Sequence, residues 1–351
     1  MKLVWTYNVY FFRISWNYGI KIMKNLKIIF SCVISVFITG CSSTKKIDDP
    51  KILDKMIREK QQSTVAEILD ENENPDWTVY KHVIVVGIDG AGTFEGKCNT
   101  PHIDAIFSNG VWTPKCKASK PTISAECWGS MLTGIEPQVH MLTNERVDNY
   151  PYEFEAYPTI FSLARKTHPE AKLGAFCGWA PIYKGIIEQG IGVVTGTGTD
   201  DKVAKQAADY IRAEKPELVF VQFDSVDHAG HNMGYCTKDY FAALEAVDDY
   251  VAEIYLAAQE AGILEDTLFI LTADHGGIFK GHGGNTLSES RVYFGAVGKT
   301  VPKNTKLSLE GRDLAAIVCR ALNLKTNKKW HSAVPKKMFK EPRPAKITVK
   351  E

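Results

Sequence analysis

The side chains best suited to chemistry are carboxylates and imidazoles that follow three short apolar runs of the sequence. Six of them stand out: Asp89, Asp227, His231, Asp274, His275 and His282. Carboxylate oxygens and neutral imidazole nitrogens suit zinc, and three such ligands per ion leave a position open for a substrate. Six ligands are enough for two ions about 4 Å apart, as in two-metal phosphoryl transfer. We therefore expect a site for two zinc ions, although the same ligands suit other divalent metals.

These polar groups recur at the ends of apolar runs, which distinguishes them from ordinary turns. The stretches "GIDGAG" (87–92), "DSVDHAGH" (224–231) and "ADHGG" (273–277) each follow an apolar run. A lone Asp or His at one such place is more simply a turn residue. Three groups at successive places favour one shared site instead. His228 is the exception in the second group, and we expect it to face solvent or to support a ligand.

The apolar runs predict the elements that must hold these side chains. Continuous apolar segments, typical of strands buried on both faces of a parallel sheet, occupy 81–88, 172–179, 217–223, 266–273 and 291–298. Helical periodicity lies between or after them, in 201–214, 238–262 and 312–322. This alternation predicts an α/β fold with a doubly wound, mostly parallel sheet and helices on both faces. Ligands of such folds gather beyond the carboxyl ends of the strands, where the three polar groups lie.

A candidate nucleophile lies in "SKPTISAECWGSMLTG" (119–134), which offers the hydroxyls of Thr122 and Ser124. Either hydroxyl could instead cap the N-terminus of a helix. With this segment included, the chain resembles the alkaline phosphatase superfamily, and within it the type I phosphodiesterase/nucleotide pyrophosphatase branch. In that branch the nucleophile stands nine residues before the threonine of a "TG" pair, and Thr133-Gly134 therefore favours Ser124. In "GIEPQVHMLTN" (134–144), Asn144 matches the asparagine that contacts the substrate phosphate.

The resemblance implies a division of the ligands between two zinc ions. One ion would be bound by Asp227, His231 and His282, and the other by Asp89, Asp274, His275 and the Ser124 oxygen. It also implies a hydrolase of phosphate esters that works through a phosphoseryl intermediate. Phosphodiesters or nucleotides are the expected substrates, and Trp128, Trp179 and Tyr183 are candidates for a leaving-group pocket.

The spacing of the last ligand departs from the larger phosphodiesterases of this branch. His282 lies seven residues after His275, which is more similar to phosphonoacetate hydrolases and cofactor-independent phosphoglycerate mutases. A phosphomonoesterase or a phosphonate hydrolase on the same scaffold therefore stays open. For a phosphomonoesterase, Arg146 is the nearby cation that could pair with the second phosphate charge.

Two further readings are weaker. A sulfatase shares the fold, but "SAECWGSM" (124–131) lacks the proline and arginine of the motif that sulfatases modify. A non-catalytic surface lipoprotein that binds glycans would leave the metals with a structural role. Structural zinc sites normally have four protein ligands, whereas three ligands per ion beside a hydroxyl favour catalysis.

The N-terminal residues predict export. From Met23, "MKNLKIIFSCVISVFITGCSS" has a basic start, a short apolar core and "ITGC", which resembles a bacterial lipobox. We expect an upstream mis-start at 1–22, a signal peptide at 23–40, a lipid on Cys41 and a tether at 41–77. The predicted location is the bacterial cell envelope, with the protein anchored to the membrane and periplasmic or surface-exposed.

The remaining chain is expected to form one catalytic domain, 78–324, and a solvated basic tail, 325–351. The tail has nine lysines or arginines against two glutamates. Over the whole chain 42 basic residues nearly balance 41 acidic ones, so no nucleic-acid partner is expected. Export would allow disulfides among the six cysteines after Cys41, and Cys98 with Cys116 is one candidate pair.

Overall fold

A computed structural model describes residues 80–340 of the protein, except 95, 154–155 and 327–329. The expected signal peptide, the lipidated Cys41 and the tether lie outside the described residues. Within the described part of the chain, no helix has both the length and the hydropathy needed to cross a membrane.

The central element is an eight-stranded mixed sheet with the order β4-β3-β5-β1-β6-β7-β2-β8. Its strands are β1 (His82–Ile88), β2 (Val111–Lys117), β3 (Leu173–Cys177), β4 (Val193–Gly196), β5 (Leu218–Phe223), β6 (Thr267–Thr272), β7 (Arg291–Val297) and β8 (Thr305–Lys306). Strands β4, β3, β5, β1 and β6 are mutually parallel, whereas β7 is antiparallel to both β6 and β2. The mostly parallel sheet expected from the sequence is confirmed, and β7 is the strand that reverses direction.

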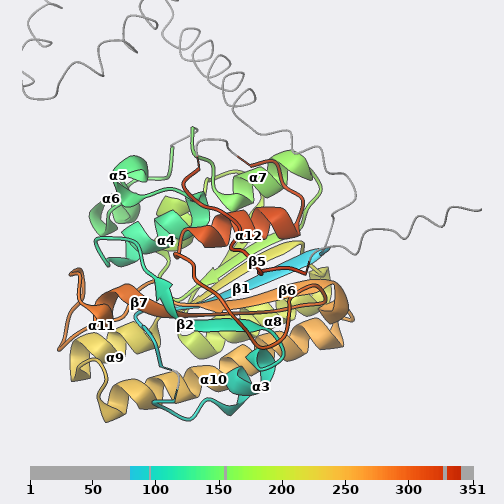
Figure 1. The fold of residues 1–351 in the computed structure, drawn as a ribbon. Helices are drawn as coiled ribbons and strands as arrows, with labels where there is room; N and C mark the ends of the chain where they lie inside the picture. Colours follow the sequence, from blue (N-terminus) through green and yellow to red (C-terminus); the bar gives the residue numbers. More distant parts are fainter. Residues whose placement is uncertain (1–79, 95, 154–155, 327–329, 341–351) are drawn as a thin grey trace, which may run out of the picture. The chain divides into compact units, whose positions relative to one another are not determined.

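Helices cover both faces of this sheet (Figure 1). One face carries α4 (Ser124–Thr133), α5 (Pro137–His140), α6 (Asn144–Asn149), α7 (Ile160–Thr167) and α12 (Asp313–Ala321). The other carries α3 (Pro101–Phe107), α8 (Asp200–Glu214), α9 (Ser225–Met233) and α10 (Lys238–Glu260). Short elements complete the fold: a π-helical turn (Ile182–Ile186), a 3-10 turn (Leu264–Asp266) and α11 (Leu287–Ser290).

The core explains why the central strands have almost continuous apolar sequences. Every residue of β5 and β6 is buried, because helices pack on both sides of these strands. Gln222 is the polar exception in β5, and its side chain is fully buried. A polar group that is fully buried requires hydrogen-bond partners. The partners of Gln222 belong to the site described below.

Two expectations are corrected by the packing. Part of the predicted solvated tail belongs to the folded domain, because Met338 is fully buried and the His331 amide donates to Gly134 O at 3.1 Å. The proposed pair of Cys98 and Cys116 is not formed, and all six described cysteines are free thiols. Cys116 points into the core from β2, while Cys98 is half-buried in the loop after β1.

Candidate active site and metal centre

The predicted ligands meet at the edge of the sheet where β1, β5 and β6 end. Asp89 directly follows β1, and Asp274 and His275 follow β6. After β5 the chain enters α9, which places Asp227 and His231 one turn apart on the same helix face. Gly90 allows the close approach of these segments, because a Cβ there would lie 2.3 Å from Asp227 Oδ1 and its φ is +66°.

Hydrogen bonds to the backbone fix the tautomers of the three predicted histidine ligands. Nδ1 of His231 lies 2.9 Å from Lys280 O, and Nδ1 of His282 lies 2.7 Å from Thr122 O. Nδ1 of His275 lies 3.0 Å from Gly276 O. A carbonyl oxygen can only accept, so each Nδ1 carries the hydrogen and donates it. In the neutral rings all three Nε2 atoms therefore present lone pairs, the form in which histidine binds metals.

These lone pairs face one another and the carboxylates. The Nε2 atoms of His231 and His282 are 3.1 Å apart, and Nε2 of His231 is 3.3 Å from Asp227 Oδ2. Nε2 of His275 is 3.2 Å from Asp274 Oδ2 and 3.6 Å from Asp89 Oδ1. Acceptors at such distances repel one another unless a cation or a proton lies between them. The donor set therefore fits divalent cations.

The buried carboxylates support the same conclusion. Asp89 Oδ1 and Asp274 Oδ2 are buried and have no hydrogen-bond partner in the described structure. Burial and then repulsion between the two carboxylates raise the pKa of Asp89 well above its usual value. Burial, with the charge of Asp227, raises the pKa of Asp274 to about 8. Bound cations would lower the pKa values of both carboxyl groups, since an opposite charge favours the ionised carboxylate.

Five of the six predicted ligands form two overlapping groups, and His231 lies beside the second of them through its contacts with Asp227 and His282. The candidate ligand atoms of Asp89, Asp274 and His275 lie within 4.8 Å of one another, and so do those of Asp227, His275 and His282. His275 and His282 stack with their ring centroids 3.8 Å apart, which puts His275 between the groups. Burial lowers the pKa of His275, and burial followed by the charge of His275 lowers the pKa of His282. Both shifts keep the rings neutral and able to bind a metal.

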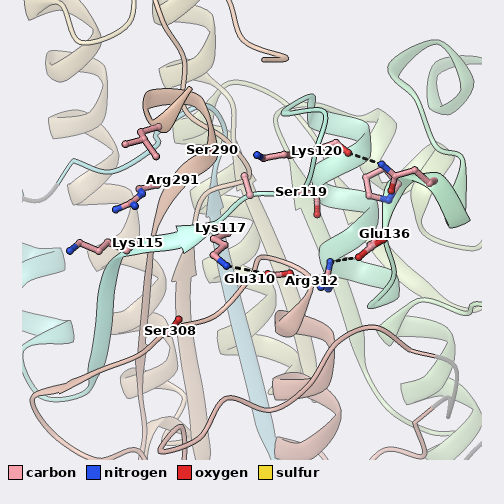
Figure 2. Close-up of a pocket in the computed structure, with 14 residues that line it drawn as sticks. Lys115, Lys117, Ser119, Lys120, Glu136, Ser290, Arg291, Ser308, Glu310 and Arg312 are labelled. Carbon is pink, nitrogen blue, oxygen red and sulfur yellow. Dashed lines mark hydrogen bonds and ion pairs between the residues drawn. The ribbon is translucent and has the colours of Figure 1, made fainter. Parts of the chain in front are cut away.

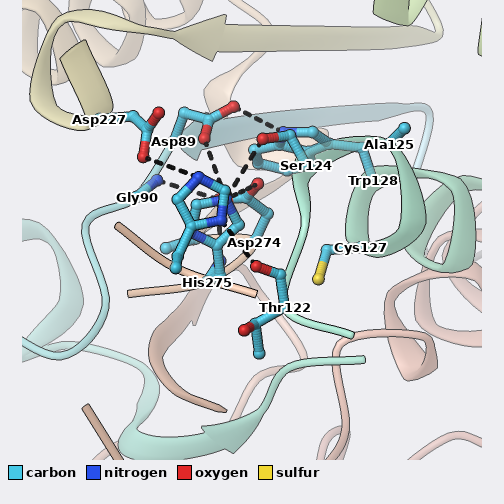
Figure 3. A network of polar contacts seen from close by, with 12 residues as sticks. Asp89, Gly90, Thr122, Ser124, Ala125, Cys127, Trp128, Asp227, Asp274 and His275 are labelled. Carbon is cyan, nitrogen blue, oxygen red and sulfur yellow. Dashed lines mark hydrogen bonds and ion pairs between the residues drawn. The ribbon is translucent and has the colours of Figure 1, made fainter. Parts of the chain in front are cut away.

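Ser124 is the first residue of α4, and its hydroxyl joins the same cluster (Figure 3). Ser124 Oγ lies 3.2 Å from Nε2 of His275. Because that nitrogen has no hydrogen, the hydroxyl donates to it. The start of the helix also favours negative charge on the serine oxygen or on a bound phosphate.

Thr122, the other candidate, has a structural contact instead. Its hydroxyl donates to Gly284 O at 2.9 Å and accepts from the Gly283 amide at 3.0 Å. Both partners belong to the loop that carries His282. Thr122 therefore holds this loop against the segment that precedes Ser124, and its hydroxyl is already engaged.

Asn144 lies next to the start of α4. Its Oδ1 accepts the Ala125 amide at 3.0 Å, which satisfies one N–H of the first helical turn. This contact turns the asparagine amide nitrogen away from Ala125, and the side chain is exposed. The arrangement suits a donor to phosphate oxygens beside Ser124.

Several positioning residues were not foreseen from the sequence. Gln222 Nε2 donates to Asp89 Oδ2 at 3.0 Å and to Asp224 Oδ1 at 3.1 Å, and its Oε1 accepts the Trp179 amide at 2.8 Å. The Tyr235 hydroxyl donates to Asp227 Oδ1. A buried glutamine two residues before Asp224, in an otherwise apolar strand, was the available signal. Tyr235 follows the ligand-bearing segment without a comparable pattern.

Trp128 has a different position from the one expected. It is fully buried, so it cannot line a leaving-group pocket, and its Nε1 donates to Asp89 Oδ2 at 2.9 Å. Trp179 and Tyr183 are half-buried and remain candidates for that pocket. His228 is exposed on α9.

A third group of possible ligands, His102, Asp248 and Asp249, has a structural explanation. The Asp248 carboxylate accepts the backbone amides of His102 and Ile103, at 3.0 and 2.8 Å. These amides belong to the first turn of α3, so Asp248 on α10 caps that helix. The group is separate from the cluster around His275.

Comparisons with known proteins identify the family and the fold. Residues 83–279 match the model of the family described as type I phosphodiesterase/nucleotide pyrophosphatase. Over 179 residues the chain is 27% identical to GPI ethanolamine phosphate transferase 2 of Aspergillus fumigatus, covering 49% of this chain and 23% of that protein. The chain therefore spans about a quarter of the length of this curated relative.

Solved structures show the same fold. Murine ectonucleotide pyrophosphatase/phosphodiesterase 5 has a TM-score of 0.61 at 15% identity, covering 72% of this chain and 97% of that one. A 2-O GAG sulfatase has a TM-score of 0.60 at 13% identity, covering 72% and 73%. At these identities the likeness concerns the fold alone, whereas the family match extends over more than half of the sequence. The chain belongs to the type I phosphodiesterase/nucleotide pyrophosphatase family, within the alkaline phosphatase superfamily.

Proposed function

We propose that the protein hydrolyses phosphate esters with Ser124 as its nucleophile and two divalent cations, zinc first among them, as cofactors. One observation carries the proposal: three Nε2 lone pairs and two unpartnered carboxylate oxygens converge beside the Ser124 hydroxyl. Asp227, His231 and His282 would hold one ion, and Asp89, Asp274 and His275 the other. This division follows the family resemblance, and the distances between the side chains are compatible with it.

The proposed reaction has two displacement steps at phosphorus. When bound, the cations would neutralise charge that develops on the phosphoryl group and favour ionised oxygen at neutral pH. Ser124 Oγ attacks phosphorus, so that an Oγ–P bond forms while the bond to the leaving alcohol breaks. Water then breaks the Oγ–P bond and restores the serine. The Asn144 amide group would donate to a non-bridging oxygen during both steps.

Phosphodiesters or nucleotides are the proposed substrates. The family description supports this class, and an inactive form of the murine structural relative is in complex with AMP. Arg146, the cation considered for monoesters, lies on α6. Burial raises the pKa of Tyr152, and the charge of Arg146 opposes part of that rise. A diesterase does not need this cation at the scissile phosphate.

Export and lipid anchoring through Cys41 complete the proposal. They rest on the basic start, the apolar core and the "ITGC" stretch before Cys41. Radiolabelled lipid incorporation, compared between the wild-type protein and Cys41→Ser, would test them independently of the enzymatic activity.

The activity is tested by comparing bis(4-nitrophenyl) phosphate with 4-nitrophenyl phosphate at one pH and one zinc concentration. We expect chelation to abolish turnover, zinc to restore it, and kcat/KM to be higher for the diester. The comparison of the two substrates is then repeated with the Arg146→Ala variant. A monoester preference that collapses in this variant would make the protein a phosphomonoesterase, and full activity without metal would refute the metal-dependent mechanism.

A further inference from the structure

A cleft of about 640 Å³ opens on the β2 and β7 side of the domain, outside the metal cluster. Five of its fourteen lining residues are cationic: Lys115, Lys117, Lys120, Arg291 and Arg312. Figure 2 shows Lys115 and Arg291 extending in the same direction from neighbouring strands. Two acidic residues, Glu136 and Glu310, also line the cleft.

The acidic residues neutralise only part of this charge. Arg312 pairs with Glu136 at 2.8 Å and with Glu310 at 2.6 Å, and Lys117 lies 3.5 Å from Glu310. Among the described residues, Lys115, Lys120 and Arg291 form no ion pair. The cleft therefore has three uncompensated positive charges.

The pairing of the strands brings like charges together. Lys117 of β2 and Arg291 of β7 are direct cross-strand partners in the antiparallel register. Like charges at such positions destabilise a sheet. Lys115 lies two residues before Lys117 in β2, and both are exposed whereas Cys116 between them is buried, so the two lysines share one side of the strand. An anion bound in the cleft would offset this repulsion.

The cleft opens at the edge of the sheet that carries the metal cluster. β6 ends beside Asp274, and the antiparallel β7 begins at the same edge, where it pairs with the last residue of β2. Two strand spacings separate β6 from β2, which is about 10 Å. Lys120 also lies only four residues before Ser124 in the chain. The cleft and Ser124 therefore lie at the same edge of the sheet.

We propose that this cleft binds a second anionic group of the same substrate molecule, about 10 Å from the phosphate that is cleaved. The group is an oxyanion such as a phosphate, sulfate or carboxylate, recognised by Lys115, Lys120 and Arg291. This inference rests on the proposed ester hydrolysis, because it names a recognition element of the substrate for that reaction. It makes the enzyme selective for esters that carry negative charge at both ends.

The test uses matched 4-nitrophenyl phosphodiesters of triethylene glycol that end in a hydroxyl, a sulfate or a carboxylate. The spacer of three glycol units reaches about 10 Å, the expected separation of the two sites. For the wild-type holoenzyme we expect kcat/KM to be at least about tenfold higher with either anionic end, as charge-assisted hydrogen bonds would give. This preference should weaken as salt is raised, since the screening length falls. A preference for one anionic end alone would identify the oxyanion that the cleft selects.

Two variants that each remove three positive charges distinguish binding in the cleft from general attraction between the protein and an anionic substrate. In the triple variant Lys115→Gln, Lys120→Gln, Arg291→Gln the preference should disappear, while turnover of the hydroxyl-ended ester is retained. The control is Lys166→Gln, Lys215→Gln, Lys303→Gln, which removes three exposed charges at the opposite edge of the sheet and should keep the preference. Equal preference in both triple variants would overturn the proposal.

A binding measurement keeps the inference independent of catalysis. Sucrose octasulfate should bind the zinc-loaded Ser124→Ala protein, and the cleft variant should bind it at least about tenfold more weakly than the control variant. If no ester is cleaved by the wild-type protein, the proposed function fails, and this measurement still decides the anion site. Equal binding to both variants would refute it.

Discussion

The Ser124 hydroxyl lies 3.2 Å from Nε2 of His275, and the His275 Nδ1 hydrogen is held by Gly276 O. The serine hydroxyl thus donates to one of the inward-facing acceptors. Replacing Ser124 with alanine should lower kcat by at least about a thousandfold, because it removes the proposed nucleophile. Zinc content and melting temperature should be close to wild type. An active Ser124→Ala protein would assign the nucleophile elsewhere.

Thr122 should matter for stability rather than for chemistry. Thr122→Ala removes a donor to Gly284 O and an acceptor for the Gly283 amide, both beside His282. We expect a loss of about 1–2 kcal/mol in the free energy of unfolding, measured by denaturant titration. Thr122→Ser retains the hydroxyl and is the matched control. If Thr122→Ala abolished activity while its stability was unchanged, Thr122 would have to be reconsidered as the nucleophile.

Two histidines on α9 provide a paired test of the metal site. His231 faces Asp227 and His282, whereas His228 is exposed on the same helix. His231→Gln should lower the bound zinc from two equivalents toward one and reduce kcat by at least about a hundredfold. His228→Gln should leave both values unchanged. Metal analysis of the purified variants gives the answer, and equal losses in both would contradict the assignment.

Gln222 should affect metal affinity without touching a metal. Its amide donates to Asp89 Oδ2, so Gln222→Leu leaves that carboxylate with Trp128 as its remaining described side-chain donor. Loss of such a supporting contact typically weakens metal binding by about 10- to 100-fold. Competition with a zinc-binding dye would measure this change. A lower melting temperature with unchanged zinc affinity would limit Gln222 to a role in folding.

The buried ring of His140 should make the free energy of unfolding depend on pH. The ring accepts the Leu142 amide and contacts Glu126 O, and burial lowers its pKa to about 4. The unfolded chain binds a proton near pH 6.5, so this contribution is complete above that pH and is lost as the pH falls toward 4. The difference in unfolding free energy between wild type and His140→Gln should therefore shrink by about 3 kcal/mol from pH 8 to pH 4. A constant difference would contradict a buried, neutral ring.

Several strands could be predicted because the doubly wound fold buries them on both faces. β1, β3, β5, β6 and β7 all lie within the apolar runs seen in the sequence. β2 was missed because "VWTPKCK" contains a proline and two lysines, and one of its sides opens into the basic cleft. β4 and β8 are short and have no fully buried residue, and they lack an apolar run. Their existence depends on pairing with neighbours that a local pattern does not reveal.

The metal ligands could be predicted from the sequence more readily than the residues that hold them in position. Ligands such as Asp89 and Asp274 follow buried strands directly, and their place in the chain fixes their place in space. The role of Trp128 was misjudged because the direction of a side chain on α4 depends on how that helix packs. The cleft also needed the structure, because the charges of Lys115 and Arg291 meet only through the register of β2 and β7.

The reversed direction of β7 has a practical consequence for protein engineering. The strand begins beside the reactive edge and ends at the opposite one, so the turn between β7 and β8 is remote from Ser124. Lys303 and Asn304 in this turn are exposed. Exposed loop tips accept inserted sequence more readily than buried segments. A fluorescent reporter or an affinity handle inserted between these two residues would leave the reactive edge free for bulky substrates.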